Sequence, residues 1–165
     1  MKLTQLLERL EYEIRQGSDE VEVTELINDS RKVTEGSVFV CISGAVSDGH
    51  KYIDDVAAKG AVAVIVERPV EAPKGLTVIH VDDTRYALAL MSAAYFGYPA
   101  EKLKVIGITG TKGKTTTTYM VKSILEGVGH KVGLIGTIEA IIGDKAIPAN
   151  NTTPESYTIH QYFAQ

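Results

Sequence analysis

Seventeen residues from Val105 to Val121, VIGITGTKGKTTTTYMV, constrain the fold of this chain more than any other stretch. An apolar run, predicted as a strand over Lys104 to Thr109, leads into a glycine-rich segment and then into a predicted helix over Lys114 to Glu126. Glycines allow successive backbone N–H groups to point into one concavity, and the start of a helix adds partial positive charge. This order of elements predicts a phosphate-binding loop.

The residue types within this loop indicate separate roles. Gly110 and Gly113 are expected to form the turn, Lys114 to reach the β- and γ-phosphates of a bound ligand, and the Thr115 hydroxyl to ligate Mg²⁺. The spacing departs from the strict G-x-x-x-x-G-K-[ST] pattern, because Ile108 stands where the first glycine belongs. A glycine-rich turn with a solvated lysine is the alternative interpretation.

The surrounding pattern predicts an α/β fold. In the first part of the chain, apolar residues recur at helical spacing from Leu3 to Ile14. Three apolar runs rich in β-branched residues then read as strands: SVFVCIS, AVAVIVE and LTVIHV. Helices are expected over Tyr52 to Lys59 and, behind a cap at Asp82, Asp83 or Thr84, up to about Phe96. The nearly unbroken AVAVIVE run is typical of a strand covered on both faces.

A domain boundary is predicted near Tyr98 to Lys102, where Gly97 and Pro99 stop the preceding helix. This places one domain over 1–100 and the start of a second over 101–165. Beyond the boundary, strand, loop, helix and the run KVGLIG suggest a βαβ unit in a parallel sheet. A hairpin is expected with Gly143 and Asp144 at its turn, followed by a helix from Ser156. One βαβ unit and a hairpin cannot bury both faces of a sheet, so apolar faces should remain uncovered and association or partial disorder is expected there.

Composition excludes several functional classes. The formal net charge of −4, with no cluster of cations, argues against a nucleic-acid-binding protein. No apolar run is long enough to span a membrane, and the amino terminus lacks the pattern of a signal peptide. The single cysteine, Cys41, is expected to be a buried thiol on a strand. A cytoplasmic location is therefore predicted.

The loop sequence TGTKGKTT resembles the T-G-T-N-G-K-T-T loop of the Mur ligases, the ATP-dependent amide-forming enzymes of peptidoglycan precursor synthesis. The loop of that family also lacks the first glycine of the strict pattern. Lys112 stands at the usual asparagine position and is a departure from it. The resemblance implies that ATP binds at Gly110, Thr111, Lys112, Gly113, Lys114, Thr115 and Thr116, with Lys114 as a catalytic residue and Thr115 as a ligand of Mg²⁺.

The resemblance extends upstream over DSR, SVFV and DGH between Asp29 and His50. In the relatives that act on the muramoyl peptide, this domain holds the uridine diphosphate end of the substrate. By position, the UDP-contacting residues would be Ser30, Ala45, Val46 and Ser47. For DSR, local capping and bridging within a polar turn is an equal alternative to a UDP contact. For DGH, the alternative is a simple turn. His50 has no second ligand at metal spacing, so a metal site is not expected there.

Downstream, NNTTPES resembles the N-T-T-P segment of the family member that adds the third amino acid to the UDP-N-acetylmuramoyl-dipeptide. It implies that Asn151, Thr152 and Thr153 bind this acidic substrate. The alternative is a helix cap ahead of Ser156. Thr137 lies at the expected carboxyl end of a strand, where open α/β sheets place ligands.

The function implied by the resemblance is ATP-dependent formation of an amide through an acyl phosphate, with the UDP-N-acetylmuramoyl-dipeptide and a free amino acid as substrates. Mur ligases supply further catalytic groups and a third, amino-acid-selecting domain at positions beyond residue 165. The chain is therefore expected to be an amino-terminal portion that needs the remainder of the ligase for turnover. A different P-loop enzyme such as a small-molecule kinase, a non-catalytic module that binds UDP-sugars or nucleotides, and another Mur-type ligase are the alternatives.

Overall fold

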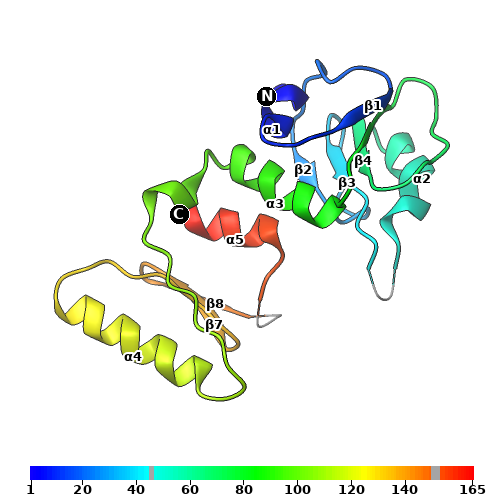
Figure 1. Ribbon diagram of the computed structural model, residues 1–165. Coiled ribbons are helices and arrows are strands. Elements are labelled where there is room, and N and C mark those ends of the chain that lie inside the picture. The colour runs from blue at the N-terminus through cyan, green and yellow to red at the C-terminus, as the bar shows by residue number, and fades with distance from the viewer. Residues whose placement is uncertain (45–46, 150–152) are drawn as a thin grey trace. The chain divides into compact units, whose positions relative to one another are not determined.

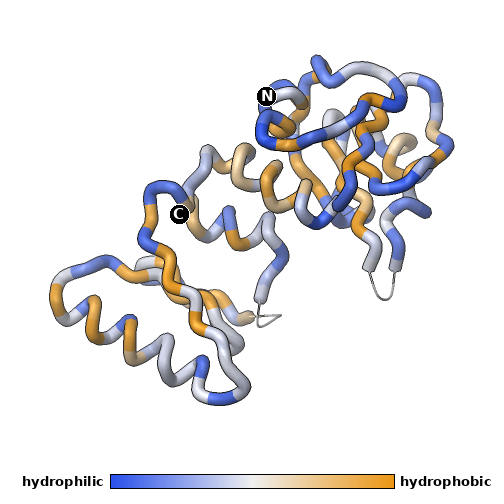
Figure 2. The backbone as a smooth tube through the Cα atoms, viewed as in Figure 1, coloured by the Kyte–Doolittle hydropathy of each residue, from blue (hydrophilic) through white to orange (hydrophobic). Residues whose placement is uncertain are grey.

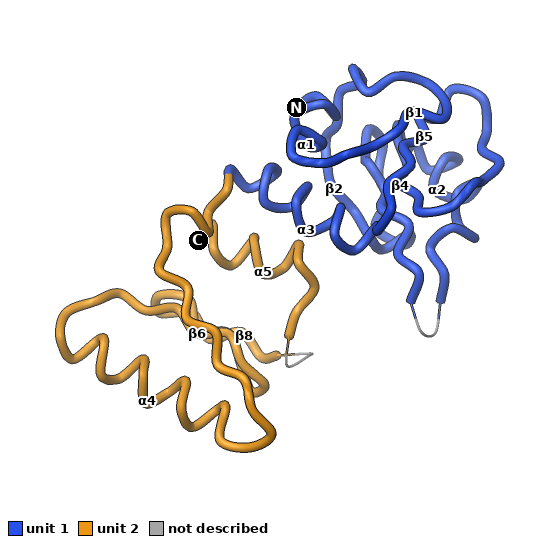
Figure 3. The backbone as a smooth tube through the Cα atoms, viewed as in Figure 1, with its two compact units in different colours: residues 1–97 blue, residues 98–165 orange. Residues whose placement is uncertain are grey.

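The computed structural model describes residues 1–44, 47–149 and 153–165. The chain divides into two compact units, residues 1–97 and residues 98–165, which Figure 3 shows in separate colours. Both units combine helices with a β-sheet, which confirms the predicted α/β class. No described helix has the length and apolar character that crossing a bilayer requires.

The first unit is built on a five-stranded sheet. Its strands are β1 (Glu13–Gln16), β2 (Leu26–Ile27), β3 (Val38–Val40), β4 (Ala63–Val66) and β5 (Thr77–His80), in the spatial order β1-β5-β4-β3-β2. Strands β2 to β5 run parallel to one another, and β1 pairs antiparallel with β5. The carboxyl ends of the four parallel strands therefore lie at one edge of the sheet, and the segments that follow them meet there.

Helices cover both faces of this sheet (Figure 1), which explains why its central strands are apolar throughout. On one face, Phe39, Val64 and Val78 pack with Ile53 and Val56 of α2 (Ile53–Ala58). A 3₁₀ helix, η1 (Gly49–Tyr52), leads directly into α2. On the other face lie α1 (Leu3–Leu7) and α3 (Thr84–Tyr95), and the alternate strand residues that point there are buried as well: Val38, Val40, Ile65 and Ile79. The buried strands β3 and β4 are hydrophobic along their length, as the colouring of Figure 2 shows, whereas the edge strand β1 is mostly hydrophilic.

The predicted helix from Leu3 to Ile14 is too long. Helix α1 ends at Leu7, and Ile14 belongs to β1, where it pairs with Ile79 of β5. Leu3, Leu6 and Leu7 are fully buried, whereas Ile14 is 46% exposed. The helical spacing of Ile14 was therefore coincidental, because pairing with the edge of the sheet determines its conformation.

The cap of α3 is among the three candidates expected. Asp83 accepts hydrogen bonds from the backbone N–H groups of Arg85 (2.8 Å) and Tyr86 (3.0 Å). Gly97 follows the helix with φ of +72°, a conformation that glycine adopts without strain. Cys41 is buried at the end of β3, as predicted, and burial raises the pKa of its thiol to about 12.

The second unit begins with a 3₁₀ helix, η2 (Pro99–Lys102), and continues into α4 (Lys114–Gly127). Its sheet has three antiparallel strands, β6 (Leu134–Ile135), β7 (Glu139–Ile142) and β8 (Lys145–Pro148), and α5 (Ser156–Phe163) follows. The expected hairpin is present as β7 and β8, with Gly143 at its turn in a left-handed conformation (φ +56°).

The predicted strand over Lys104 to Thr109 and its parallel pairing are not observed. These residues are extended without strand pairing, and no described strand of this unit has a parallel partner. Val105 and Ile106 are 60% and 62% exposed. A β-branched sequence forms a strand only where a neighbour accepts and donates the ladder hydrogen bonds, and none of the described segments pairs with this one.

Candidate functional site

The glycine-rich loop leads directly into α4. Gly113 is the N-cap of α4 and adopts a left-handed conformation with φ of +79°, and Gly110 has φ of +150°. A Cβ atom at Gly113 would meet no atom within 4 Å, so the backbone conformation, rather than lack of space, explains the glycine. The Gly113 carbonyl accepts from the Thr117 N–H at 2.9 Å, the first turn of the helix. The N–H groups of the residues before Thr117 have no carbonyl partner inside the helix and point toward the loop.

A cavity of about 370 Å³ lies at the start of α4. The loop and the helix contribute Gly110, Lys114 and Thr115, and the far wall consists of Ile135, Gly136 and Thr137 at the end of β6. The remaining lining residues are Ile108, Thr109, Thr118 and Thr153. Apart from one lysine, the side-chain polar groups of this lining are hydroxyls. A cavity with a helix start, a cation and no carboxylate in its lining suits an anion such as phosphate.

Lys114 bonds back to the loop that precedes it. Its ammonium group donates a solvent-accessible hydrogen bond of 2.6 Å to the Gly110 carbonyl oxygen, and the residue as a whole is partly buried. Lys114 also lines the cavity, so its charge lies at the start of α4.

The hydroxyl groups of this cavity can be compared with what Mg²⁺ requires. Magnesium prefers oxygen ligands and, at nucleotide sites, takes many of them from phosphate and water. Thr115 lines the cavity and offers one such oxygen. Within the part of the chain that the structure describes, no cluster of three or more His, Cys, Asp or Glu side chains could hold a metal ion. The residues present are compatible with a magnesium ion that arrives with the phosphates of a nucleotide, and Thr115 is the residue that would hold it.

The other residues predicted to bind ATP are not part of the cavity lining. Thr111, Lys112, Gly113 and Thr116 are exposed and do not line it. Thr137, in contrast, lines it from the opposite side, and Thr118 of α4 lines it too. Thr118 donates its hydroxyl hydrogen to the Thr115 carbonyl at 2.7 Å, so it also braces the first turn of α4.

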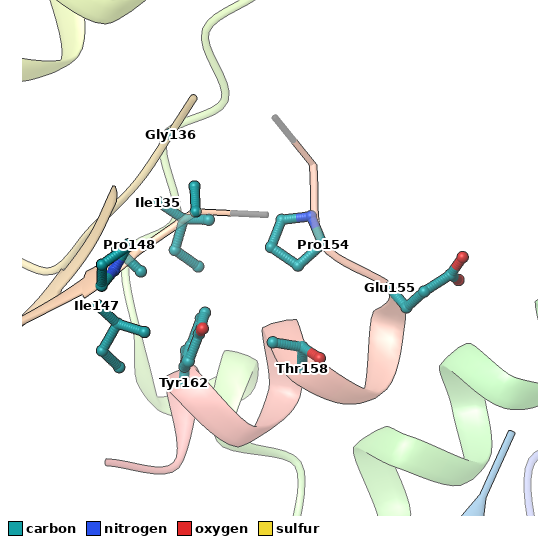
Figure 4. A pocket seen from close by; sticks show the side chains of 10 residues that line it. Ile135, Gly136, Ile147, Pro148, Pro154, Glu155, Thr158 and Tyr162 are labelled. Atoms are coloured by element: carbon teal, nitrogen blue, oxygen red, sulfur yellow. The ribbon is translucent and has the colours of Figure 1, made fainter. Parts of the chain in front are cut away.

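A second cavity, of about 200 Å³, shares Ile135 and Gly136 with the first. Figure 4 shows Pro154, Thr158 and Tyr162 facing Ile147 and Pro148 of β8 across it. The predicted substrate residue Thr153 lines the first cavity, whereas Asn151 and Thr152 lie outside the described residues. The N-cap of α5 is Glu155, directly ahead of Ser156, and it makes no side-chain cap hydrogen bond.

In the first unit, Ser30 and Ser47 follow the neighbouring parallel strands β2 and β3, so both lie toward the carboxyl edge of the sheet. The Ser30 carbonyl accepts from the Lys59 ammonium at 2.8 Å, and the Ser47 hydroxyl bonds the Tyr52 hydroxyl at 3.0 Å. Ala45 and Val46 lie outside the described residues. Open α/β sheets bind ligands at this edge, which suits the predicted position of the UDP contacts.

Asp29 and Arg31 of the DSR segment form the local bridge expected as an alternative. The Arg31 guanidinium donates to both carboxylate oxygens of Asp29, at 2.9 and 2.8 Å. This pairing lowers the pKa of Asp29 to about 2. Local bridging and ligand contact are compatible here, because the bridge uses Asp29 and Arg31 and leaves the Ser30 hydroxyl available.

His50 links two segments through both nitrogens of its ring. Its Nδ1 lies 2.8 Å from Oδ1 of Asp48, and its Nε2 accepts from the Glu67 backbone N–H at 3.2 Å. Because Nε2 is the acceptor, the proton of the neutral ring is on Nδ1 and is donated to Asp48. The bond from His50, joined by one from Arg68, lowers the pKa of Asp48 to about 2.

Lys59 and Tyr52 contact the predicted UDP residues Ser30 and Ser47, and Glu67 contacts the nearby Ser43; none of the three was identified from the sequence. Lys59 and Tyr52 are exposed and occur in a polar segment, so no pattern distinguished them. Glu67 carried a usable signal, since it is the single carboxylate that directly follows the buried run AVAVIV. A charged residue at the carboxyl end of a parallel strand is placed where ligands bind.

Comparison with known proteins agrees with this architecture. Residues 22–98 match the Mur ligase family catalytic domain, and residues 108–165 match the Mur ligase middle domain. A UDP-N-acetylmuramoyl-L-alanyl-D-glutamate--2,6-diaminopimelate ligase of Clostridium perfringens is 50% identical over 163 residues, and one of Clostridium acetobutylicum is 48% identical over 164. Each alignment covers 99% of this chain and 34% of the relative, so the chain spans about a third of the length of these relatives.

Solved structures show the same fold. A UDP-N-acetylmuramoyl-L-alanyl-D-glutamate--2,6-diaminopimelate ligase superposes with a TM-score of 0.77 at 20% identity, over 99% of this chain and 33% of the other. MurF from Acinetobacter baumannii superposes with a TM-score of 0.58 at 27% identity, over 99% of this chain and 32% of the other. MurF ligase from Thermotoga maritima, solved in complex with ADP, gives 0.54 at 25% identity, over 87% of this chain and 29% of the other.

Proposed function

The chain belongs to the Mur ligase family, and from that premise we propose that it contributes the UDP-binding and ATP-binding parts of a ligase. The ligase adds an amino acid to UDP-N-acetylmuramoyl-L-alanyl-D-glutamate in peptidoglycan precursor synthesis. The proposed amino acid is 2,6-diaminopimelate, because the curated relatives at 50% and 48% identity are named for it. The reaction belongs in the cytoplasm, where its nucleotide substrates are made.

The observation that carries this proposal is the cavity at the start of α4, with Lys114 bonded to Gly110 across the loop. In the proposed reaction, the terminal carboxylate of the substrate attacks the γ-phosphate of ATP. The bond from the γ-phosphorus to its bridging oxygen breaks, and ADP leaves. Negative charge on the transferred group and on ADP is stabilised by Lys114 and by the N–H groups at the start of α4. A MurF ligase from Thermotoga maritima has been solved in complex with ADP, which supports nucleotide binding by a member of this family.

The acyl phosphate formed in this way is then attacked by the amine of the incoming amino acid, and phosphate leaves as the amide forms. A magnesium ion, with Thr115 as its proposed protein ligand, would supply further charge neutralisation at the phosphates. Thr153 and Thr137 line the same cavity and can donate hydrogen bonds to the acidic end of the substrate. The first unit would hold the uridine diphosphate through Ser30, Ala45, Val46 and Ser47, and Asn151 and Thr152 would assist Thr153.

The proposal is tested with the complete gene product. The product is incubated with UDP-N-acetylmuramoyl-L-alanyl-D-glutamate, MgATP and either meso-2,6-diaminopimelate or lysine, and the nucleotide products are measured by mass spectrometry. We expect ATP-dependent addition of 2,6-diaminopimelate in preference to lysine, and no addition by the Lys114→Ala variant. Binding of the UDP substrate without product, whichever amino acid is offered, would contradict the ligase and favour a non-catalytic UDP-sugar-binding module.

A further inference from the structure

Glu67 joins two segments at the carboxyl edge of the first sheet. Its Oε1 accepts from the Ser43 hydroxyl at 2.6 Å, and its Oε2 accepts from the Thr84 hydroxyl at 2.7 Å and the Thr84 N–H at 3.1 Å. Ser43 comes after β3, Glu67 comes directly after β4, and Thr84 begins α3. These bonds lower the pKa of Glu67, so it is a carboxylate at neutral pH.

The neighbouring backbone of Glu67 holds a second segment. Its N–H donates to Nε2 of His50, whose Nδ1–H donates to Asp48, and Arg68 pairs with the same Asp48 carboxylate. The His50 side chain is buried, so the two bonds that it makes are shielded from water, whereas the Arg68 side chain is half exposed. Two consecutive residues after β4 therefore fix both Ser43 and Asp48.

Ser43 and Asp48 are the two sides of one loop. They form an isolated antiparallel bridge, and the Gly44 N–H donates to the Ser47 carbonyl at 2.9 Å. We call the described residues Ser43, Gly44, Ser47 and Asp48 the loop stem. Gly49 directly follows the loop stem. A Cβ atom at this position would lie 2.8 Å from the Ile42 nitrogen, so only glycine fits here without a backbone shift. Ser47, one of the proposed UDP contacts, belongs to this stem.

The cap of α3 does not require Glu67. Asp83 already accepts from the N–H groups of Arg85 and Tyr86, and Glu67 adds bonds to Thr84. Ser43 is exposed, and water could satisfy its hydroxyl. The bond from Ser43 to Glu67 is thus not needed to bury a polar group, and its direct effect is to fix the stem against the sheet.

We propose that Glu67 is a positioning residue for the uridine diphosphate site, which it preorganises by holding the loop stem through Ser43. The inference rests on the proposed function, because it assumes that UDP binds beside Ser47. Preorganisation raises affinity, since a loop already held in its binding conformation loses less entropy when the ligand arrives. Glu67 itself does not need to contact the ligand.

Calorimetric titration of the 165-residue chain with UDP tests this, with two variants that each remove one partner of Glu67. Ser43→Ala removes the bond to the stem, and Thr84→Val removes a bond to the helix while the Thr84 N–H remains. We expect Ser43→Ala to weaken UDP binding about tenfold with a melting temperature near that of the wild type. Thr84→Val should lower the melting temperature and leave the UDP affinity within about twofold, because Glu67 still holds Ser43.

Two further variants separate positioning from direct contact. Glu67→Ala should weaken UDP binding as much as Ser43→Ala does. The double variant that carries both Ser43→Ala and Glu67→Ala should bind UDP no more weakly than Glu67→Ala alone, because both changes remove the same hydrogen bond. Glu67→Gln should recover most of the affinity, since the amide can accept from Thr84 and donate to the Ser43 oxygen.

The outcomes are distinguishable. If the wild-type chain does not bind UDP, the proposed UDP site fails and this inference fails with it. If the wild type binds and Ser43→Ala and Glu67→Ala bind equally well, only the inference is wrong. If the affinity follows the melting temperature across all four single variants, or the effects of Ser43→Ala and Glu67→Ala add, Glu67 has no positioning role.

Discussion

The ammonium group of Lys114 donates a hydrogen bond of 2.6 Å to the carbonyl oxygen of Gly110, across the turn of the glycine-rich loop. The bond places a positive charge at the start of α4, where the helix dipole also favours an anion. A phosphate that enters the cavity would meet a cation already held in place. When the ligand enters, the Gly110 carbonyl would either keep its bond from Lys114 or accept a bond from water in its place, so the loop needs little rearrangement.

The Lys114→Ala variant should bind MgATP about 10- to 100-fold more weakly, because hydrogen bonds to charged groups contribute roughly 1.5–3 kcal/mol. Lys112→Ala is the matched control, since Lys112 is in the same loop but is exposed and does not line the cavity. It should weaken binding by less than about threefold, as expected for a screened surface charge. Equal losses for the two variants, measured by calorimetry, would show that only the net charge of the loop matters.

The Thr115→Val variant should remove the dependence of ATP affinity on magnesium. The wild-type chain is expected to bind ATP more tightly with Mg²⁺ than with EDTA, because Thr115 can provide an oxygen ligand to the ion. The variant should bind equally in both conditions. Thr117→Val serves as the control, because Thr117 is exposed outside the cavity lining, and it should keep the magnesium effect. A magnesium effect that persists in Thr115→Val would remove Thr115 from the proposed ligand set.

Acid should cancel the contribution of Asp48 to the stability of the first unit. His50 and Arg68 lower its pKa from 3.8 to about 2, so the folded state binds this proton less readily than the unfolded state. The stabilisation is therefore present above about pH 4 and is lost as the pH falls toward 2. Urea unfolding of wild type and Asp48→Asn should show a stability difference at pH 5 that shrinks by pH 2.5. A difference that does not change with pH would contradict the ionic role of Asp48.

Burial on α3 predicts the effect of two substitutions on the same helix. Leu88 is 1% exposed and packs in the core, so Leu88→Ala should lower the free energy of unfolding by about 2–5 kcal/mol. Tyr86 is 61% exposed, and Tyr86→Ala should change the free energy of unfolding by less than about 0.5 kcal/mol. Chemical denaturation measures both. Comparable losses would mean that α3 is not packed on the sheet as described.

The Cys41 thiol should be unreactive in the folded protein. Burial raises its pKa to about 12, so the thiolate that reacts with disulfide reagents is almost absent at pH 8. We expect Ellman's reagent to label the chain slowly in buffer and rapidly in denaturant. Rapid labelling without denaturant would show that the end of β3 opens readily.

Helices and turns that depend only on nearby residues could be predicted from the sequence. Helix α3, with Asp83 as its cap, and the hairpin turn at Gly143 follow from local chemistry that the fold leaves unchanged. Elements that depend on a distant partner could not. Ile14 fits a helix by spacing, yet it forms a strand because β5 is available to pair with it. Val105 and Ile106 have strand propensity, but no described segment pairs with them.

The candidate site shows the same division. Gly110, Lys114 and Thr115 are close in sequence, and the strand-like run, loop and helix order was enough to predict that they act together. The opposite wall, Ile135 and Gly136, is brought there by the fold, and spacing could not identify it. Glu67 and Lys59 likewise contact their partners across 24 and 29 residues of sequence. Such contacts depend on the sheet register, which local pattern does not specify.

The central claim, that the loop ahead of α4 binds the phosphates of a nucleotide, is tested most directly by NMR of the isotope-labelled chain titrated with MgATP. The backbone amide signals of Gly110 to Thr116, together with Thr137 across the cavity, should shift in a saturable way and report one dissociation constant. The signals of α3 should not move. If these amides remain unchanged at saturating nucleotide, or if the shifts occur only outside the cavity, the loop is not a phosphate site and the account is wrong.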